Sequence, residues 1–158
     1  GISYLTQDFN KVVYECLQHG LEQIRKYDEF ILIFPPNTPH PAETIEAFKE
    51  FCMANSIKYS VHKKVADIDV KKGHAYFVIK DNDLVAIVKD CKQKGFKLGT
   101  DIGILSYNDT PMKEIVGSGI TVISTDFIEM GKKAAAFVSK KEKISEQLPS
   151  RLIVRGSL

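Results

Sequence analysis

Polar side chains follow four apolar runs of this sequence, at the points where each run ends. They occupy residues 37–40, 80–81, 107–109 and 124–126. Hydroxyl, amide and carboxylate groups of this kind suit a polyhydroxylated or otherwise polar small ligand. Asp, Asn, Ser and Thr are also favoured at helix caps and turns for backbone reasons alone. The pattern by itself therefore leaves both a ligand site and ordinary caps open.

Catalytic and metal-binding patterns are not found in the sequence. The histidines, at positions 19, 40, 62 and 74, have no ligand spacing to one another or to the cysteines, so no metal site is expected. Asp67 and Asp69 lie in a lysine-rich polar stretch, which indicates a solvated loop because nothing nearby would separate their pKa values. Gly117 and Gly119 lack the third glycine of a dinucleotide loop and predict a plain turn. We expect no enzyme activity and no cofactor.

The elements that must position the polar groups alternate between strand and helix signals. Apolar runs predict strands at 2–5, 30–34, 57–61, 75–79, 102–105, 120–123 and 152–154. Helical spacing predicts helices over 8–27 with Asp8 as N-cap, from Pro41, from Asp81 as cap to Gly95, and over 127–141. The predicted fold class is α/β, three layers with helices on both faces of a parallel sheet. The carboxyl ends of such strands meet at one edge, where ligands bind.

Bulk properties set limits on class and compartment. The 158 residues are 44% hydrophobic, enough for one packed domain, and a net charge of +2 gives no electrostatic footprint for nucleic acid. Three widely spaced cysteines in apolar surroundings predict reduced, buried thiols and a cytoplasmic location. No stretch predicts a membrane span or a signal peptide. The start at Gly1, directly before a strand-like segment, predicts an excised fragment.

A family resemblance is carried by motifs between Lys80 and Ala135. They are Lys80-Asp81 and the stretches 95–99, 101–111, 120–127 and 130–135. The chain resembles the sensor domain of the lac-repressor and type I periplasmic-binding-protein families. The sequence of residues 124–131 is similar to that of sensors attached to GntR-type winged-helix regulators. The resemblance implies a C-terminal lobe made of 6–123 and 150–158. Residues 1–5 and 127–148 would be elements of an incomplete N-terminal lobe.

The resemblance also implies a set of ligand-binding positions. Asn108 stands where the family commonly has a carboxylate, Lys80 replaces an asparagine and Thr44 replaces an arginine. Thr125 replaces an interlobe glutamine or similar residue, and Thr38 and His40 lie in a loop that often reaches the ligand. A neutral amide at 108 beside a cation at 80 would tolerate an anionic group, so a sugar acid or a phosphorylated sugar joins the candidate ligands.

The expected function is a ligand-gated switch in a bacterial transcriptional regulator. A sugar-like effector would bind in a cleft between two lobes and control a DNA-binding head that is absent here, so DNA would be a partner only through that head. The apolar stripe of 127–141 predicts packing against this lobe or self-association, most simply a homodimer. The alternatives are a solute-binding protein of a transport system and a small α/β enzyme.

Overall fold

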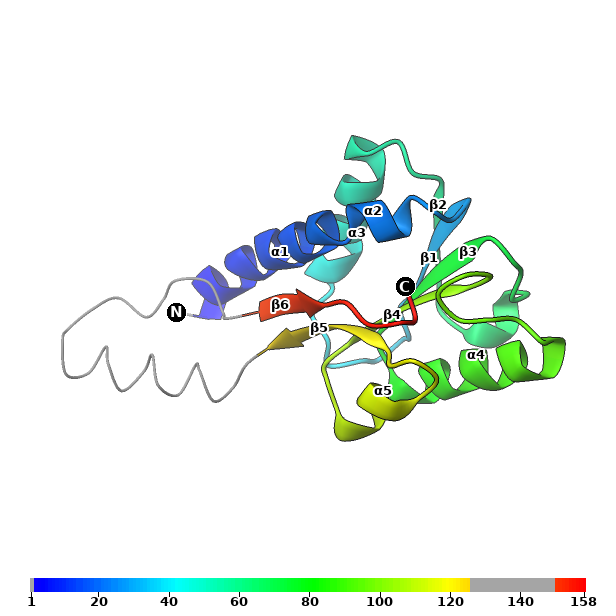
Figure 1. Ribbon diagram of the computed structural model, residues 1–158. Coiled ribbons are helices and arrows are strands. Elements are labelled where there is room, and N and C mark those ends of the chain that lie inside the picture. The colour runs from blue at the N-terminus through cyan, green and yellow to red at the C-terminus, as the bar shows by residue number, and fades with distance from the viewer. Residues whose placement is uncertain (1, 126–149) are drawn as a thin grey trace.

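The computed structural model describes residues 2–125 and 150–158, which form a three-layer α/β fold (Figure 1). The strands are β1 (Glu29–Ile33), β2 (Tyr59–His62), β3 (His74–Val78), β4 (Gly103–Tyr107), β5 (Thr121–Thr125) and β6 (Ser150–Ile153). The helices are α1 (Ile2–His19), α2 (Leu21–Ile24), α3 (Glu43–Ala54), α4 (Asp81–Lys94) and α5 (Pro111–Ile115), with a 3₁₀ turn, η1, at Val65–Asp67. The predicted α/β class and layering are confirmed.

The sheet has the order β2-β1-β3-β4-β5-β6. Neighbours from β2 to β5 are parallel, and β6 is antiparallel to β5. Phe30 and Leu32 of β1 belong to the core on one face, whereas Ile31 and Ile33 belong to the core on the other. Burial on both faces explains why β1 and β3 are continuous apolar runs rather than alternating ones.

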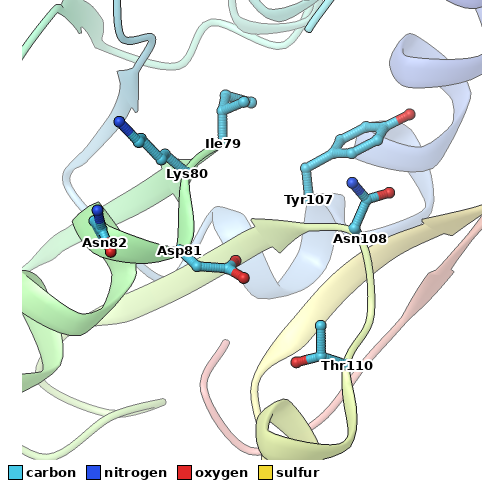
Figure 2. Close-up of a pocket in the computed structure, with 7 residues that line it drawn as sticks. All are labelled: Ile79, Lys80, Asp81, Asn82, Tyr107, Asn108 and Thr110. Carbon is cyan, nitrogen blue, oxygen red and sulfur yellow. The ribbon is translucent and has the colours of Figure 1, made fainter. Parts of the chain in front are cut away.

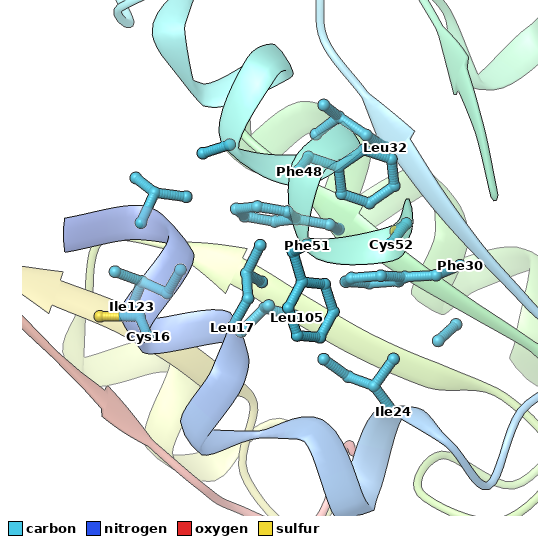
Figure 3. Close-up of a cluster of buried hydrophobic side chains, with 14 of the residues drawn as sticks. Cys16, Leu17, Ile24, Phe30, Leu32, Phe48, Phe51, Cys52, Leu105 and Ile123 are labelled. Carbon is cyan, nitrogen blue, oxygen red and sulfur yellow. The ribbon is translucent and has the colours of Figure 1, made fainter. Parts of the chain in front are cut away.

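The first face of the sheet is covered by α1, α2 and α3. Its core brings Leu17 and Ile24 against the aromatic rings of Phe30, Phe48 and Phe51 (Figure 3). The ring centroids of Phe30 and Phe48 are 4.9 Å apart. This aromatic cluster packs α3 onto the sheet.

The N-terminal segment differs from the prediction. The strand expected at 2–5 is wrong, as is the N-cap at Asp8, because α1 begins at Ile2. A four-residue apolar segment is too short to separate strand from helix, and helical spacing continues through Leu5 and Phe9. The helix predicted to reach 27 breaks at Gly20, where an added Cβ would lie 2.9 Å from the Leu152 side chain of β6.

The second face is covered by α4, which packs Leu84, Ile87 and Cys91 onto the sheet. The predicted stop at Gly95 is confirmed, since this glycine ends α4 in a left-handed conformation with φ 73°. The predicted cap at Asp81 is wrong: Lys80 occupies the N-cap without a side-chain hydrogen bond, and Asp81 is the first helical residue. On the first face, α3 begins at Glu43, two residues after the predicted start at Pro41.

The edge strand β6 runs against the direction expected for an all-parallel sheet. An antiparallel edge strand on an otherwise parallel sheet is common, and its sequence carries no sign of direction. The tail after β6 is tied to the sheet by Ser157, whose hydroxyl donates to Ile104 O (2.7 Å) and accepts from Thr121 N (2.8 Å). The residues after β6 are thus part of the folded domain.

The cysteines, the Gly117–Gly119 turn and the polar loop at 67–69 are the remaining predicted features in the described part of the chain. All three cysteines are buried and free, as predicted. Gly117 and Gly119 form a turn with positive φ, and Asp67 and Asp69 lie exposed. Within residues 2–125 and 150–158, no helix has the length and apolarity to cross a bilayer. The capping box at 126–129 and the helix at 127–141 lie outside the described residues.

Candidate functional site

The topology brings the polar loops to one edge of the sheet. Strands β1, β3 and β4 are adjacent and parallel, so the residues that follow them leave at the same edge. The chain places β2 on one side of β1 and β3 on the other, which makes the carboxyl end between β1 and β3 a switch point of the topology. Ligands of open α/β sheets bind at such points.

A first cavity of about 490 Å³ opens between the start of α4 and the loop after β4. It is lined by Ile79, Lys80, Asp81, Asn82, Tyr107, Asn108 and Thr110. In Figure 2 the Asp81 carboxylate points toward the Asn108–Thr110 wall, and the Lys80 side chain extends away from that wall. The structure therefore brings the predicted residues Lys80 and Asn108 to one cavity, with Asp81 between them.

Asn108 has an unusual backbone conformation, with φ 66°. Asparagine tolerates this left-handed region better than other non-glycine residues. Its N–H donates to Ile123 O at 2.8 Å, and its carbonyl accepts from Lys113 Nζ at 2.7 Å. The backbone of Asn108 is thus held on both sides while its side chain stays exposed at the cavity.

The neighbouring carboxylate, Asp109, is engaged elsewhere. Arg155 binds it through two nitrogen–oxygen contacts, 2.9 Å and 2.8 Å long. These hydrogen bonds hold the pKa of Asp109 below its usual value of 3.8 and raise the pKa of Arg155. Asp109 therefore anchors the loop to the C-terminal tail.

A second cavity, of about 320 Å³, follows β1 and β2. Its lining residues are Phe34, Pro35, Pro36, Asn37, Thr38, His40, Ala42, Ile45, Val61, His62 and Lys63. Sequence reasoning did not select His62, the last residue of β2, or Lys63, which begins a stretch that resembles a solvated lysine-rich loop. The cavity adds an apolar wall beside the polar groups of the 37–40 loop.

His40 connects the two cavities. Its Nε2 lies 2.8 Å from Thr44 Oγ1, and its backbone N–H donates to Thr38 Oγ1 at 3.2 Å. The imidazole ring packs edge-on against Tyr107, which lines the first cavity, with centroids 4.4 Å apart. Burial lowers the pKa of His40 from 6.5 to about 4, so the ring is neutral at physiological pH.

The six predicted residues thus fall into three groups. Thr38, His40 and Thr44 are hydrogen-bonded together, and Lys80 and Asn108 share the first cavity. The side chain of Thr44 is fully buried, so it acts on the cavities only through His40. Thr125 ends β5, where its backbone pairs with Ser150 of β6.

Lys113 is the residue that sequence reasoning missed most clearly. Its side chain is only 3% exposed, and its ammonium binds Tyr107 O, Asn108 O and Asp81 Oδ1. No local pattern marks a lysine of a five-residue helix as buried. Asp81 is one of the polar residues predicted at the sheet edge, but its pairing with Lys113 depends on contact between α4 and α5.

A mostly parallel sheet with polar loops and cavities on both sides of its switch point is typical of small-molecule-binding α/β domains. Residues 17–158 match the family described as the periplasmic binding protein-like domain, and the chain belongs to this family. The resemblance drawn from the motifs is confirmed at this level. The similarity to GntR-attached sensors stays a prediction.

Relatives of known sequence and structure agree with this membership. The chain is 23% identical over 170 residues to the HTH-type transcriptional regulator GalR of Streptococcus thermophilus. The structure of a probable maltose operon transcriptional repressor from Staphylococcus aureus superimposes with a TM-score of 0.71 at 17% identity over 95% of this chain. A LacI family transcriptional regulator from Enterococcus faecalis with bound ribose gives 0.67 at 21% identity over 94%.

The chain spans only part of these proteins. It covers 51% of GalR and 60% of each of the two solved chains. All three are transcriptional regulators by name.

Proposed function

We propose that this chain is the effector-sensing part of a bacterial transcriptional regulator and that it binds a small sugar or sugar derivative. The observation that carries the proposal is the first cavity, where Asp81, Asn82, Asn108 and Thr110 gather carboxylate, amide and hydroxyl groups at the carboxyl edge of the sheet, beside the switch point of a periplasmic binding protein-like domain. Such groups exchange hydrogen bonds with the hydroxyls of a sugar ring.

The proposed effector site comprises Thr38, His40, Thr44, Lys80, Asn108 and Thr125. The His40 ring of the second cavity contacts the Tyr107 ring of the first, so the cavities are neighbours, and the proposed site has room for a polar ring in the first and a second group in the second. Lys80 and Lys63 lie at the two cavities and would accept an anionic substituent, which keeps sugar acids and sugar phosphates among the candidates.

The switch mechanism requires parts beyond the described residues. In the proposal, residues 6–123 and 150–158 form one wall of the cleft, and 1–5 and 127–148 contribute to a second lobe. Effector binding favours one arrangement of the lobes and biases an upstream DNA-binding head. The greater length of the related regulators supports this arrangement, and their names favour it over a transport protein or an enzyme.

Location and assembly follow from the same proposal. A regulator acts where the DNA is, and three buried free thiols suit the reducing cytoplasm. We further propose a homodimer, which is supported by exposed apolar side chains on α5, Met112 at 65% and Ile115 at 76%. In sedimentation, Ile115→Lys should weaken self-association, whereas Met53→Lys on exposed α3 surface should not.

The test is an NMR titration of the isotopically labelled chain with D-ribose, maltose, D-gluconate and glucose 6-phosphate. NMR detects weak binding, which matters because one wall of a cleft binds less tightly than two. We expect at least one sugar to perturb the amide resonances of residues 80–82 and 107–110. Absence of any perturbation there would contradict the proposal.

Matched variants separate the site from general effects. Asn108→Gly removes the side chain while glycine keeps the positive φ, and its control is Ser56→Gly, an exposed position with φ 55° before β2. Lys80→Ala is paired with Lys89→Ala, an exposed lysine of α4, the helix that begins directly after Lys80. We expect the first member of each pair to weaken binding about tenfold, as loss of a ligand hydrogen bond does, and the control to leave it unchanged.

A further inference from the structure

A buried cation lies beneath the first cavity. Lys113 belongs to α5 and is 3% exposed, although an isolated charge in such a place is strongly unfavourable. Lysine is rarely buried unless its charge is paired. The surroundings of Lys113 must therefore compensate this cost.

The compensation comes from acceptors for all three ammonium protons. Nζ lies 2.9 Å from Asp81 Oδ1, 2.7 Å from Asn108 O and 3.2 Å from Tyr107 O. Asp81 begins α4, whereas Tyr107 and Asn108 follow β4. One side chain thus connects the two walls of the first cavity from below.

These bonds determine how the cavity presents its polar groups. Two consecutive carbonyls are directed toward Lys113, which holds the peptide planes on either side of Asn108 and supports its φ of 66°. The Asp81 carboxylate is 62% exposed and binds Lys113 through one oxygen, so the other oxygen faces the cavity side. The spacing between this carboxylate and the Asn108 amide depends on the lysine between them.

We infer that Lys113 is a positioning residue that sets which arrangement of ligand hydroxyls the first cavity accepts, without contacting the ligand itself. The inference rests on the proposed function of that cavity. The Lys113 ammonium neutralises the Asp81 charge only in part, so the carboxylate remains a strong acceptor for hydroxyl donors. A ligand whose hydroxyls bridge Asp81 and Asn108 would lose both contacts if the bridge were removed.

The decisive experiment is a double-mutant cycle. Lys113→Met keeps a similar length but removes the charge and the donors, and Lys89→Met on the exposed face of α4 is the matched control. With D-ribose, maltose, D-gluconate and glucose 6-phosphate as probes in the NMR titration, we expect Lys113→Met to weaken the binding of each sugar that binds the unmodified chain about tenfold or more, and Lys89→Met to have no effect. In the Asn108→Gly background, the same substitution should weaken binding less, by no more than about threefold, because only the part of its action that passes through Asp81 remains.

A second variant and a second measurement guard against misfolding. Lys113→Gln keeps a polar donor and should bind with intermediate affinity, and circular dichroism melting establishes that each variant is folded. In the unmodified chain, the protected Lys113 ammonium should give an observable ¹⁵N-correlated signal that shifts on addition of the bound sugar. That shift tests indirect coupling without any substitution.

The outcomes distinguish the two proposals. If none of the four titrated sugars perturbs the first cavity of the unmodified chain, the proposed function fails and the inference fails with it. If the unmodified chain binds and folded Lys113→Met binds equally well, only the positioning role is refuted. If Lys113→Met reduces the affinity equally in the Asn108 and Asn108→Gly backgrounds, the positioning role is also refuted, since that result indicates general destabilisation.

Discussion

Burial of His40 makes the stability of this domain depend on pH. The imidazole is packed between Phe34 and Tyr107 and hydrogen-bonded to Thr44, and desolvation lowers its pKa from 6.5 to about 4. In the unfolded chain the ring takes up a proton near pH 6.5, whereas in the folded domain it does so only near pH 4. The unfolded state therefore binds more protons between these values, and stability falls as the pH is lowered through this window.

The size of the effect follows from the shift. Each pKa unit corresponds to about 1.4 kcal/mol, so full conversion would give roughly 3 kcal/mol. Because the ring is only half-buried, solvent screening reduces this contribution to the free energy of unfolding, and we expect about 1–2 kcal/mol. The contribution is complete above pH 6.5 and is lost toward pH 4. Asp109 titrates below its usual 3.8 and so acts outside this window.

Urea unfolding at several pH values between about 7.5 and 4.5 measures this contribution. His40→Gln removes the titrating group and keeps a side chain that can hydrogen-bond Thr44. Across the window, the unmodified chain should lose about 1–2 kcal/mol more than His40→Gln. His19→Gln, at the exposed end of α1, should behave like the unmodified chain. Parallel curves for all three proteins would refute the assignment of a buried neutral histidine.

Other predictions concern the core, the tail and the thiols. Phe48→Ala should lower the free energy of unfolding by about 3–5 kcal/mol in urea, because Phe48 is fully buried against Phe30, whereas Met53→Ala at an exposed site of α3 should change it little. Arg155→Met should cost about 1–2 kcal/mol through loss of the paired contacts to Asp109, while Arg151→Met on exposed β6 surface should be neutral; equal melting temperatures would contradict this. Burial raises the pKa of all three cysteines, to about 11 or 12, so none should react with a disulfide reagent at pH 8 until the chain unfolds, and rapid labelling of the native domain would count against the packed core.

Much of the architecture could be predicted from local sequence. The apolar run 30–34 predicted a strand buried on both faces, and Gly95 predicted the end of α4, because burial and backbone conformation leave local signals. The 2–5 segment was misassigned because a short apolar stretch fits either period. The direction of β6 could not be predicted, since it depends on the end from which the chain enters the edge of the sheet.

The candidate site shows the same division. Polar residues after the strands could be placed at one edge from topology alone, and Lys80 and Asn108 do share a cavity there. Their orientation could not be predicted: the Lys80 side chain extends away from the Asn108 wall, and Thr44 is fully buried behind His40. Rotamers and burial depend on neighbours from distant parts of the chain.

The sequence by itself determined the strand and helix periods, and through them which loops gather at the carboxyl edge of the sheet. Only the tertiary structure decided which charges in those loops remain for a ligand. Asp109 forms an ion pair with Arg155, 46 residues away, and one oxygen of Asp81 pairs with buried Lys113. Charge pairing depends on distances of a few ångströms between separate elements, and such distances leave no trace in local residue spacing.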